Sequence, residues 1–128
     1  MFLAAVLPMA LLRILAIAAA FLALGEANAQ TIAGAIYDPV REQLVVDIIY
    51  QGTNPNHQFD LVWGQCDGES PHEVEARLID RQGDDVADKE FRVRRRFDLK
   101  GLKCRPALLT LRLSRHLLSP VFIPAAPR

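Results

Sequence analysis

The chain has 128 residues, and its 15 Lys and Arg balance 15 Asp and Glu, so its formal net charge at pH 7 is zero. Binding to a nucleic acid backbone depends on an excess of positive charge, and neutrality therefore argues against DNA or RNA as a partner. The length is that of one domain of modest core size.

Residues 1–29 have the pattern of a secretory signal helix. An apolar stretch, residues 14–24, follows the positive charge of Arg13 and ends shortly before Ala27-Asn28-Ala29. A signal peptidase needs small side chains at the positions of Ala27 and Ala29, because it clamps an extended backbone against shallow pockets. We therefore expect cleavage between Ala29 and Gln30, no stable membrane span afterwards, and a periplasmic or secreted protein.

Two alternatives for this segment stay open. Met9 is a second candidate start, because Met-Ala-Leu-Leu-Arg is an ordinary charged region ahead of the apolar core. An uncleaved anchor is the other alternative, since residues 2–24 are long enough to span a bilayer. Arg13 argues against an anchor, because a charge at the bilayer centre costs at least about 2.5–3.5 kcal/mol.

Residues 30–128 are expected to form one domain, and both cysteines of the chain, Cys66 and Cys104, lie within it. Two cysteines in an exported domain most simply form one intrachain disulfide. A metal pair, an intermolecular bridge or two reduced thiols are the alternatives.

Alternation of apolar and polar residues with a period of two predicts strands throughout this domain. Clusters of Gly, Pro, Asn and Asp separate the strands. The expected strands are 31–37, 43–50, 57–66, 71–80, 90–99, 107–114 and 121–123. Seven short strands at this spacing predict an all-β fold, a small antiparallel two-sheet sandwich of immunoglobulin-like size. The resemblance to immunoglobulin domains is architectural and implies no function.

The strand pattern gives Trp63 and Arg95 structural interpretations. Trp63 follows Phe59 and Leu61 on one face of its strand, and we expect it in the core beside the disulfide. Arg95 falls on the apolar face of residues 90–99. A bulge, a snorkelling side chain or a buried ion pair would resolve that conflict.

The zero net charge conceals two segments of opposite sign. Residues 38–88 carry twelve acids against three arginines, and residues 89–115 carry ten bases against two acids. Three arginines of the basic segment alternate along one face of a strand: Arg92, Arg94 and Arg96. This arginine row is either an anion-binding face or the partner of an acidic strand carrying Glu73 and Glu75. We expect the internal pairing.

Metal binding and catalysis have weaker signals. Cys66, Asp67, Glu69, His72 and Glu73 lie within eight residues, and a thiolate with an imidazole would suit zinc or copper. The weak candidates for a metal are therefore Cys66 and His72. Ser70, His72 and Asp67 share one loop, which is more typical of a polar surface than of a catalytic site, and we expect no catalytic residue.

These features predict an exported, non-enzymatic binding or accessory protein of the bacterial periplasm or cell envelope, without a cofactor. Its partner would be an unknown envelope protein or an anionic ligand. One alternative is a periplasmic metal-binding protein that uses Cys66 and His72. The other is a loop-based protease inhibitor, because the rigid turn Asn54-Pro55-Asn56 presents a preordered edge.

Overall fold

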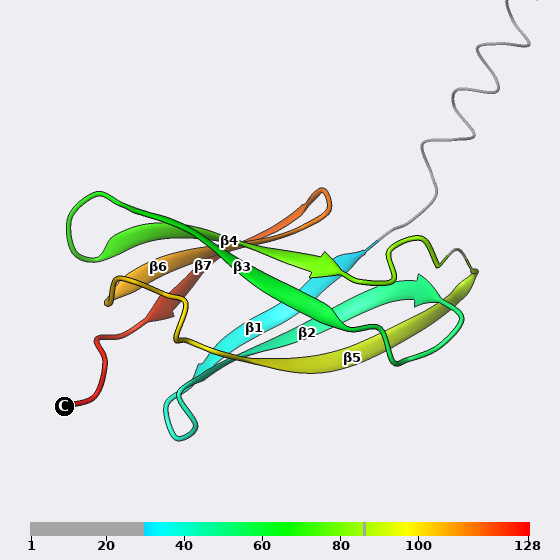
Figure 1. Ribbon diagram of the computed structural model, residues 1–128, viewed down its shortest axis with the longest axis horizontal. Coiled ribbons are helices and arrows are strands. Elements are labelled where there is room, and N and C mark those ends of the chain that lie inside the picture. Colours follow the sequence, from blue (N-terminus) through cyan, green and yellow to red (C-terminus); the bar gives the residue numbers. More distant parts are fainter. Residues whose placement is uncertain (1–29, 86) are drawn as a thin grey trace, which may run out of the picture.

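A computed structural model describes residues 30–85 and 87–128, which form seven strands in two packed sheets (Figure 1). The strands are β1 (Thr31–Asp38), β2 (Gln43–Gly52), β3 (Phe59–Asp67), β4 (His72–Asp80), β5 (Lys89–Asp98), β6 (Ala107–Leu113) and β7 (His116–Ile123). The predicted all-β sandwich is confirmed. The predicted signal segment, residues 1–29, lies outside the described residues.

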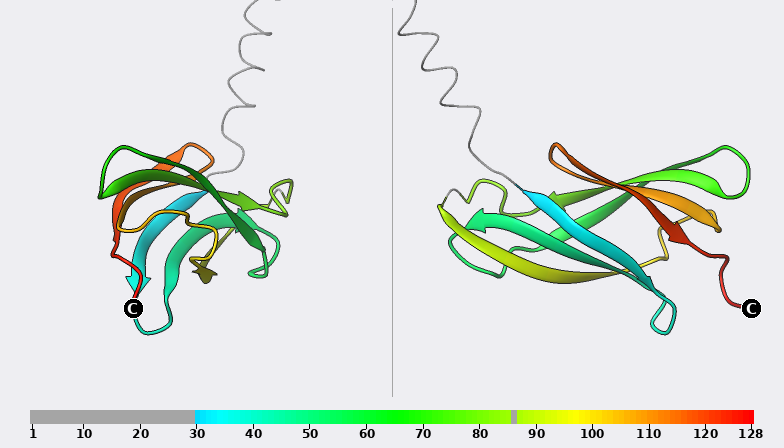
Figure 2. Two further views of the ribbon diagram at one scale, coloured as in Figure 1. Left: turned by 60° about the vertical axis from the view of Figure 1, so that its left-hand side comes forward. Right: turned by 180° about the vertical axis from the view of Figure 1, so that it is seen from behind.

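One sheet has the strand order β1-β2-β5, and the other has the order β3-β4-β6-β7 (Figures 1 and 2). Neighbouring strands are antiparallel as expected, except that β4 and β6 are parallel. The reason is that β5 lies between them in the sequence but belongs to the other sheet. The chain returns along β5 to the end at which β4 began, and β6 then runs in the direction of β4.

Strand formation follows the alternation of side chains. In β4, Val74, Ala76 and Leu78 are buried, whereas the residues between them are exposed. Strand β2 is more apolar because it is the central strand of its sheet, and its inward residues Leu44, Val46, Ile48 and Tyr50 are fully buried. The core therefore lies between the two sheets, with contributions from every strand.

The predicted disulfide between Cys66 and Cys104 is confirmed, with a distance of 6.3 Å between the two Cα atoms. It links the end of β3 to the loop between β5 and β6. Both cysteines and Trp63 are partly buried and pack against the core, as expected for Trp63. Gly101 leaves room for the indole, because a Cβ atom there would clash with Cδ1 of Trp63.

Two connections lie together at one end of the sandwich. The β2–β3 loop (residues 53–58) and the β4–β5 turn (residues 81–85) are both at the right-hand end of Figure 1. At the side of the sandwich, β1 lies along β7, where the backbone N–H of Ile32 donates to Nδ1 of His116 over 2.9 Å. Within the described residues, no helix has the length and apolarity needed to cross a membrane.

Candidate functional site

The arginine row lies on the outer face of the β1-β2-β5 sheet and is largely paired within that sheet. Arg94 donates to both carboxylate oxygens of Asp47 over 2.8 and 3.2 Å. Arg96 donates to Asp38 over 3.2 Å. The hydrogen bond from Arg94 holds the pKa of Asp47 below its ordinary value. Arg92 is exposed, and it has no hydrogen bond or ion pair with any other described residue.

The expected pairing of the row with Glu73 and Glu75 is wrong. Those glutamates are on β4, which belongs to the other sheet, and Glu75 pairs instead with Arg112 of β6 over 2.5 Å. The acids that partner the row come from β2 and from the end of β1. Internal pairing therefore occurs, but within a single sheet: β5 pairs with its neighbour β2 through Asp47, and with the end of β1 through Asp38.

Arg95 resolves its conflict with the apolar face by snorkelling. The register between β2 and β5 is regular from Gln43 to Gly52, so a bulge, one of the three alternatives, is absent from this strand pair. The half-buried side chain places its guanidinium on backbone carbonyls, donating to Pro55 over 3.1 Å and to His57 over 3.0 Å. These hydrogen bonds tie β5 to the β2–β3 loop.

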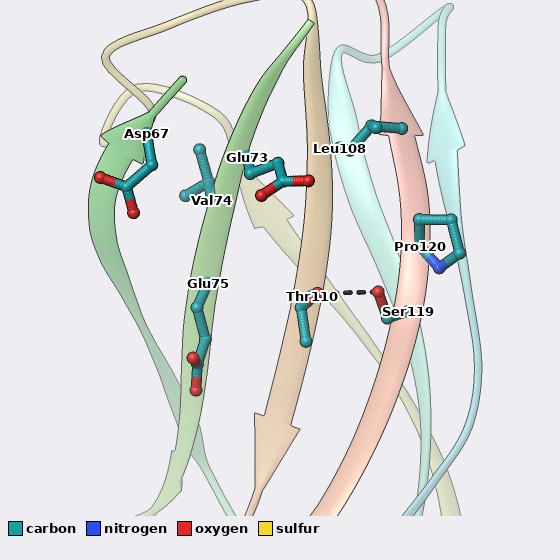
Figure 3. Close-up of a pocket in the computed structure, with 8 residues that line it drawn as sticks. All are labelled: Asp67, Glu73, Val74, Glu75, Leu108, Thr110, Ser119 and Pro120. Atoms are coloured by element: carbon teal, nitrogen blue, oxygen red, sulfur yellow. Dashed lines mark hydrogen bonds between the residues drawn. The ribbon is translucent and has the colours of Figure 1, made fainter. Parts of the chain in front are cut away.

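A groove of about 490 Å³ crosses the outer face of the β3-β4-β6-β7 sheet (Figure 3). Its acidic side chains come from β3 and β4, and its hydroxyls come from the neighbouring strands β6 and β7, where Thr110 donates a 2.8 Å hydrogen bond to Ser119. Its lining residues are Asp67, Glu73, Val74, Glu75, Leu108, Thr110, Ser119 and Pro120. Sequence reasoning missed this groove, because it depends on β6 lying beside β4.

The residues suggested for a metal do not come together as a donor set. The disulfide takes the sulfur of Cys66, so no thiolate is available beside His72 in the oxidised protein. Nδ1 of His72 is instead 2.9 Å from the carbonyl oxygen of Gly68, in the β3–β4 connection. In the part of the chain that the structure describes, no group of three His, Cys, Asp or Glu side chains could hold a metal ion.

One densely bonded polar cluster of the described residues, around His57, was not proposed from the sequence. His57 is fully enclosed, with 1% of its side chain exposed, and lies between two carboxylates. Its Nδ1 is 2.8 Å from Asp80 at the end of β4, and its Nε2 is 2.7 Å from Asp85 in the β4–β5 turn. The imidazole also stacks on the ring of Tyr50, with 4.3 Å between centroids.

This arrangement favours the charged form of His57. Burial lowers the pKa of His57, but the hydrogen bonds and charges of Asp80 and Asp85 outweigh burial and raise it above 6.5. The pKa of Asp85 is lowered, by the backbone hydrogen bond from Thr53 first and by the hydrogen bond from His57 next. We call these three residues, His57, Asp80 and Asp85, the Asp-His-Asp cluster.

Neighbouring residues complete the hydrogen bonds of both carboxylates. Asp80 accepts from the side-chain amide of Gln30 over 2.8 Å and from the backbone N–H of Gln82 over 2.9 Å. Asp85 accepts from both the backbone N–H and the hydroxyl of Thr53. A Cβ atom at Gly52 would lie within 2.8 Å of Asp85, which explains a glycine at that position.

Comparisons of the chain with known protein families, with curated proteins and with solved structures found no match.

Proposed function

We propose that this chain is an exported, non-enzymatic binding or accessory protein of the bacterial periplasm or cell envelope. The observation that carries the proposal is the disulfide between Cys66 and Cys104, with both sulfurs packed against the core. Such bridges form and persist in oxidising compartments, and cytosolic proteins seldom keep them. The signal pattern of residues 1–29 supports the same compartment.

The surroundings of the histidines support a role other than catalysis. The three histidines of the chain, His57, His72 and His116, all use Nδ1 in a hydrogen bond within the fold. His57, the most strongly engaged, is buried from solvent. A general base must reach the proton it abstracts from a substrate, and an enclosed imidazole does not offer that access.

The groove of Figure 3 is the concave surface on which we place the binding role. It combines carboxylates, hydroxyls and apolar atoms, the mixture of groups that lines many binding sites. Glu73 and Asp67 make no ion pair within residues 30–85 and 87–128. A segment of an envelope protein that carries Lys or Arg would complement those two carboxylates.

The test is a crosslinked pull-down from an envelope fraction with three forms of the mature domain. The forms are the unaltered protein, a groove variant (Asp67→Asn with Glu73→Gln) and an arginine-row variant. We expect a partner to be captured by the unaltered protein and by the row variant, and lost with the groove variant. Equal capture by all three forms would contradict a role for the groove. Loss with the row variant alone would instead favour an anionic ligand on the arginine row.

A second candidate function is supported by the rigidity of the β2–β3 loop. Tyr50 donates its hydroxyl to the carbonyl oxygen of Asn54 over 2.9 Å, and the N–H of Asn56 donates to the side chain of Asn54. Pro55 and Asn56 at the tip are exposed. A preordered exposed loop suits a loop-based protease inhibitor. Assaying the mature domain against a panel of proteases tests it, and no inhibition of any protease would refute it.

A further inference from the structure

We infer that the Asp-His-Asp cluster is a pH-sensitive latch, in which protonated His57 ties the β2–β3 loop to the β4–β5 turn and its deprotonation releases Asp85. The inference rests on the geometry of the cluster. It is independent of the proposed function and of export.

The latch works because both ring nitrogens face carboxylate oxygens at hydrogen-bond distance. A carboxylate only accepts, so both contacts are favourable only when each nitrogen carries a hydrogen, as in the imidazolium. A neutral imidazole has one N–H and one lone pair. After loss of the proton, one carboxylate therefore faces a lone pair at a distance below 3 Å and is repelled.

Burial decides which contact breaks. Asp80 has 3% of its side chain exposed and is also held by Gln30 and Gln82, so it has no direct route to water. Asp85 is 16% exposed and lies in a turn, so its carboxylate can move toward solvent. Neutral His57 is therefore expected to keep its Nδ1–H on Asp80 and to lose Asp85.

The other charged and titratable groups around His57 reinforce this. Arg95 of β5 donates to the backbone carbonyl of His57 and adds one positive charge. The ring of Tyr50 of β2 stacks on the imidazole, and the Tyr50 hydroxyl accepts a hydrogen bond from the backbone N–H of His57. Two carboxylates are thus balanced by Arg95 and the imidazolium. When His57 is neutral, a negative charge is left in a buried place, which favours movement of Asp85 to water.

The segments joined by the latch form one end of the sandwich. Arg81 strengthens the same junction, because its backbone N–H donates to the carbonyl of Gln58 and its side chain pairs with Asp60 over 2.6 Å. Release of Asp85 also weakens its hydrogen bonds to Thr53. The change is therefore local to residues 53–58 and 81–85, and the sheets stay paired.

The test is an NMR titration of the protein labelled in the imidazole rings and backbone amides. We expect both nitrogens of His57 to be protonated at pH 6 and its midpoint to lie above 6.5. The amide signals of Thr53 and Asp85 should move with the same midpoint. A His57 midpoint at or below 6.5 would overturn the inference, as would amide signals that do not respond to its titration.

Two matched variants sharpen the test. Asp85→Asn removes one carboxylate but can still accept from Thr53 and donate to a neutral imidazole, so it should lower the His57 midpoint by about one unit or more. It should also remove the response of the Thr53 amide. Asp84→Asn removes the same charge from the exposed neighbouring residue. It should leave the His57 midpoint and the pH response of the Thr53 amide unchanged. An unaltered midpoint in Asp85→Asn would refute the latch, and the titration of the unaltered protein decides the question if that variant does not fold.

Discussion

Removal of the disulfide should cost this domain a large part of its stability. The bridge joins cysteines 38 positions apart. The chain-entropy treatment gives about 4 kcal/mol at 25 °C for closing a loop of that length in the unfolded state. Measured effects commonly fall below this bound, so we expect Cys66→Ala with Cys104→Ala to lower the free energy of unfolding by about 2–4 kcal/mol. For a domain of this size, the melting temperature should fall by roughly 10–30 °C.

Urea unfolding measures the effect directly, with Trp63, the only tryptophan of the chain, as a fluorescent probe that packs against the core. The unaltered protein reduced with a thiol should match the double variant within about 1 kcal/mol, because both lack the same constraint. A loss smaller than about 0.5 kcal/mol in the double variant, a change typical of surface substitutions, would refute the reasoning.

Three further predictions concern the arginine row, two glycines and His57. Replacing the arginine row by Gln should lower the melting temperature slightly in thermal melts, because two exposed ion pairs are lost. Binding to heparin or anionic vesicles that disappears without this destabilisation would instead favour an anion-binding face. Gly64→Ala would place Cβ 2.5 Å from the carbonyl oxygen of Glu75 and should destabilise by about 1–3 kcal/mol in urea unfolding. In Gly34→Ala the new Cβ has no other atom within 4 Å, so this variant should not be destabilised. Equal losses of stability in the two variants would contradict the packing argument. Because folding raises the pKa of His57, protonated His57 contributes fully to the free energy of unfolding below about pH 6.5. That contribution is lost as the pH rises through the pKa of His57 in the folded protein. Urea unfolding across that pH range should show a decline in the free energy of unfolding that is absent in Asp85→Asn. A free energy of unfolding that does not change with pH in the unaltered protein would contradict this prediction.

Period-two patterning was sufficient to locate all seven strands, because each strand buries one face and leaves the other to solvent. Boundaries moved most in β7, which begins at His116, whereas the pattern indicated residues 121–123. The reason is the tight turn before it, where Ser114 has a positive φ of 52° that its sequence does not indicate. Polar and exposed residues in the first half of β7 also obscure the alternation.

Strand order and pairing partners were beyond the reach of the pattern. No local feature of the sequence shows that β5 pairs with β2 while β4 pairs with β6, and the expected pairing of Glu73 and Glu75 with the arginine row is wrong for that reason. The Asp-His-Asp cluster was missed for the same reason, because Asp80 and Asp85 are 23 and 28 positions from His57. The one available signal was a histidine in a turn-rich loop, with acids at the end of a strand and in the following turn.

The central claim, an exported domain closed by one disulfide, is tested most directly by one intact-mass measurement. The protein should be expressed from its full sequence, recovered from the periplasm and treated with an alkylating reagent under denaturing, non-reducing conditions. We predict the mass of residues 30–128 less two hydrogens, with no alkyl group added to Cys66 or Cys104. A mass that retains the terminus at Met1 or Met9, or that carries two alkyl groups, would contradict the claim.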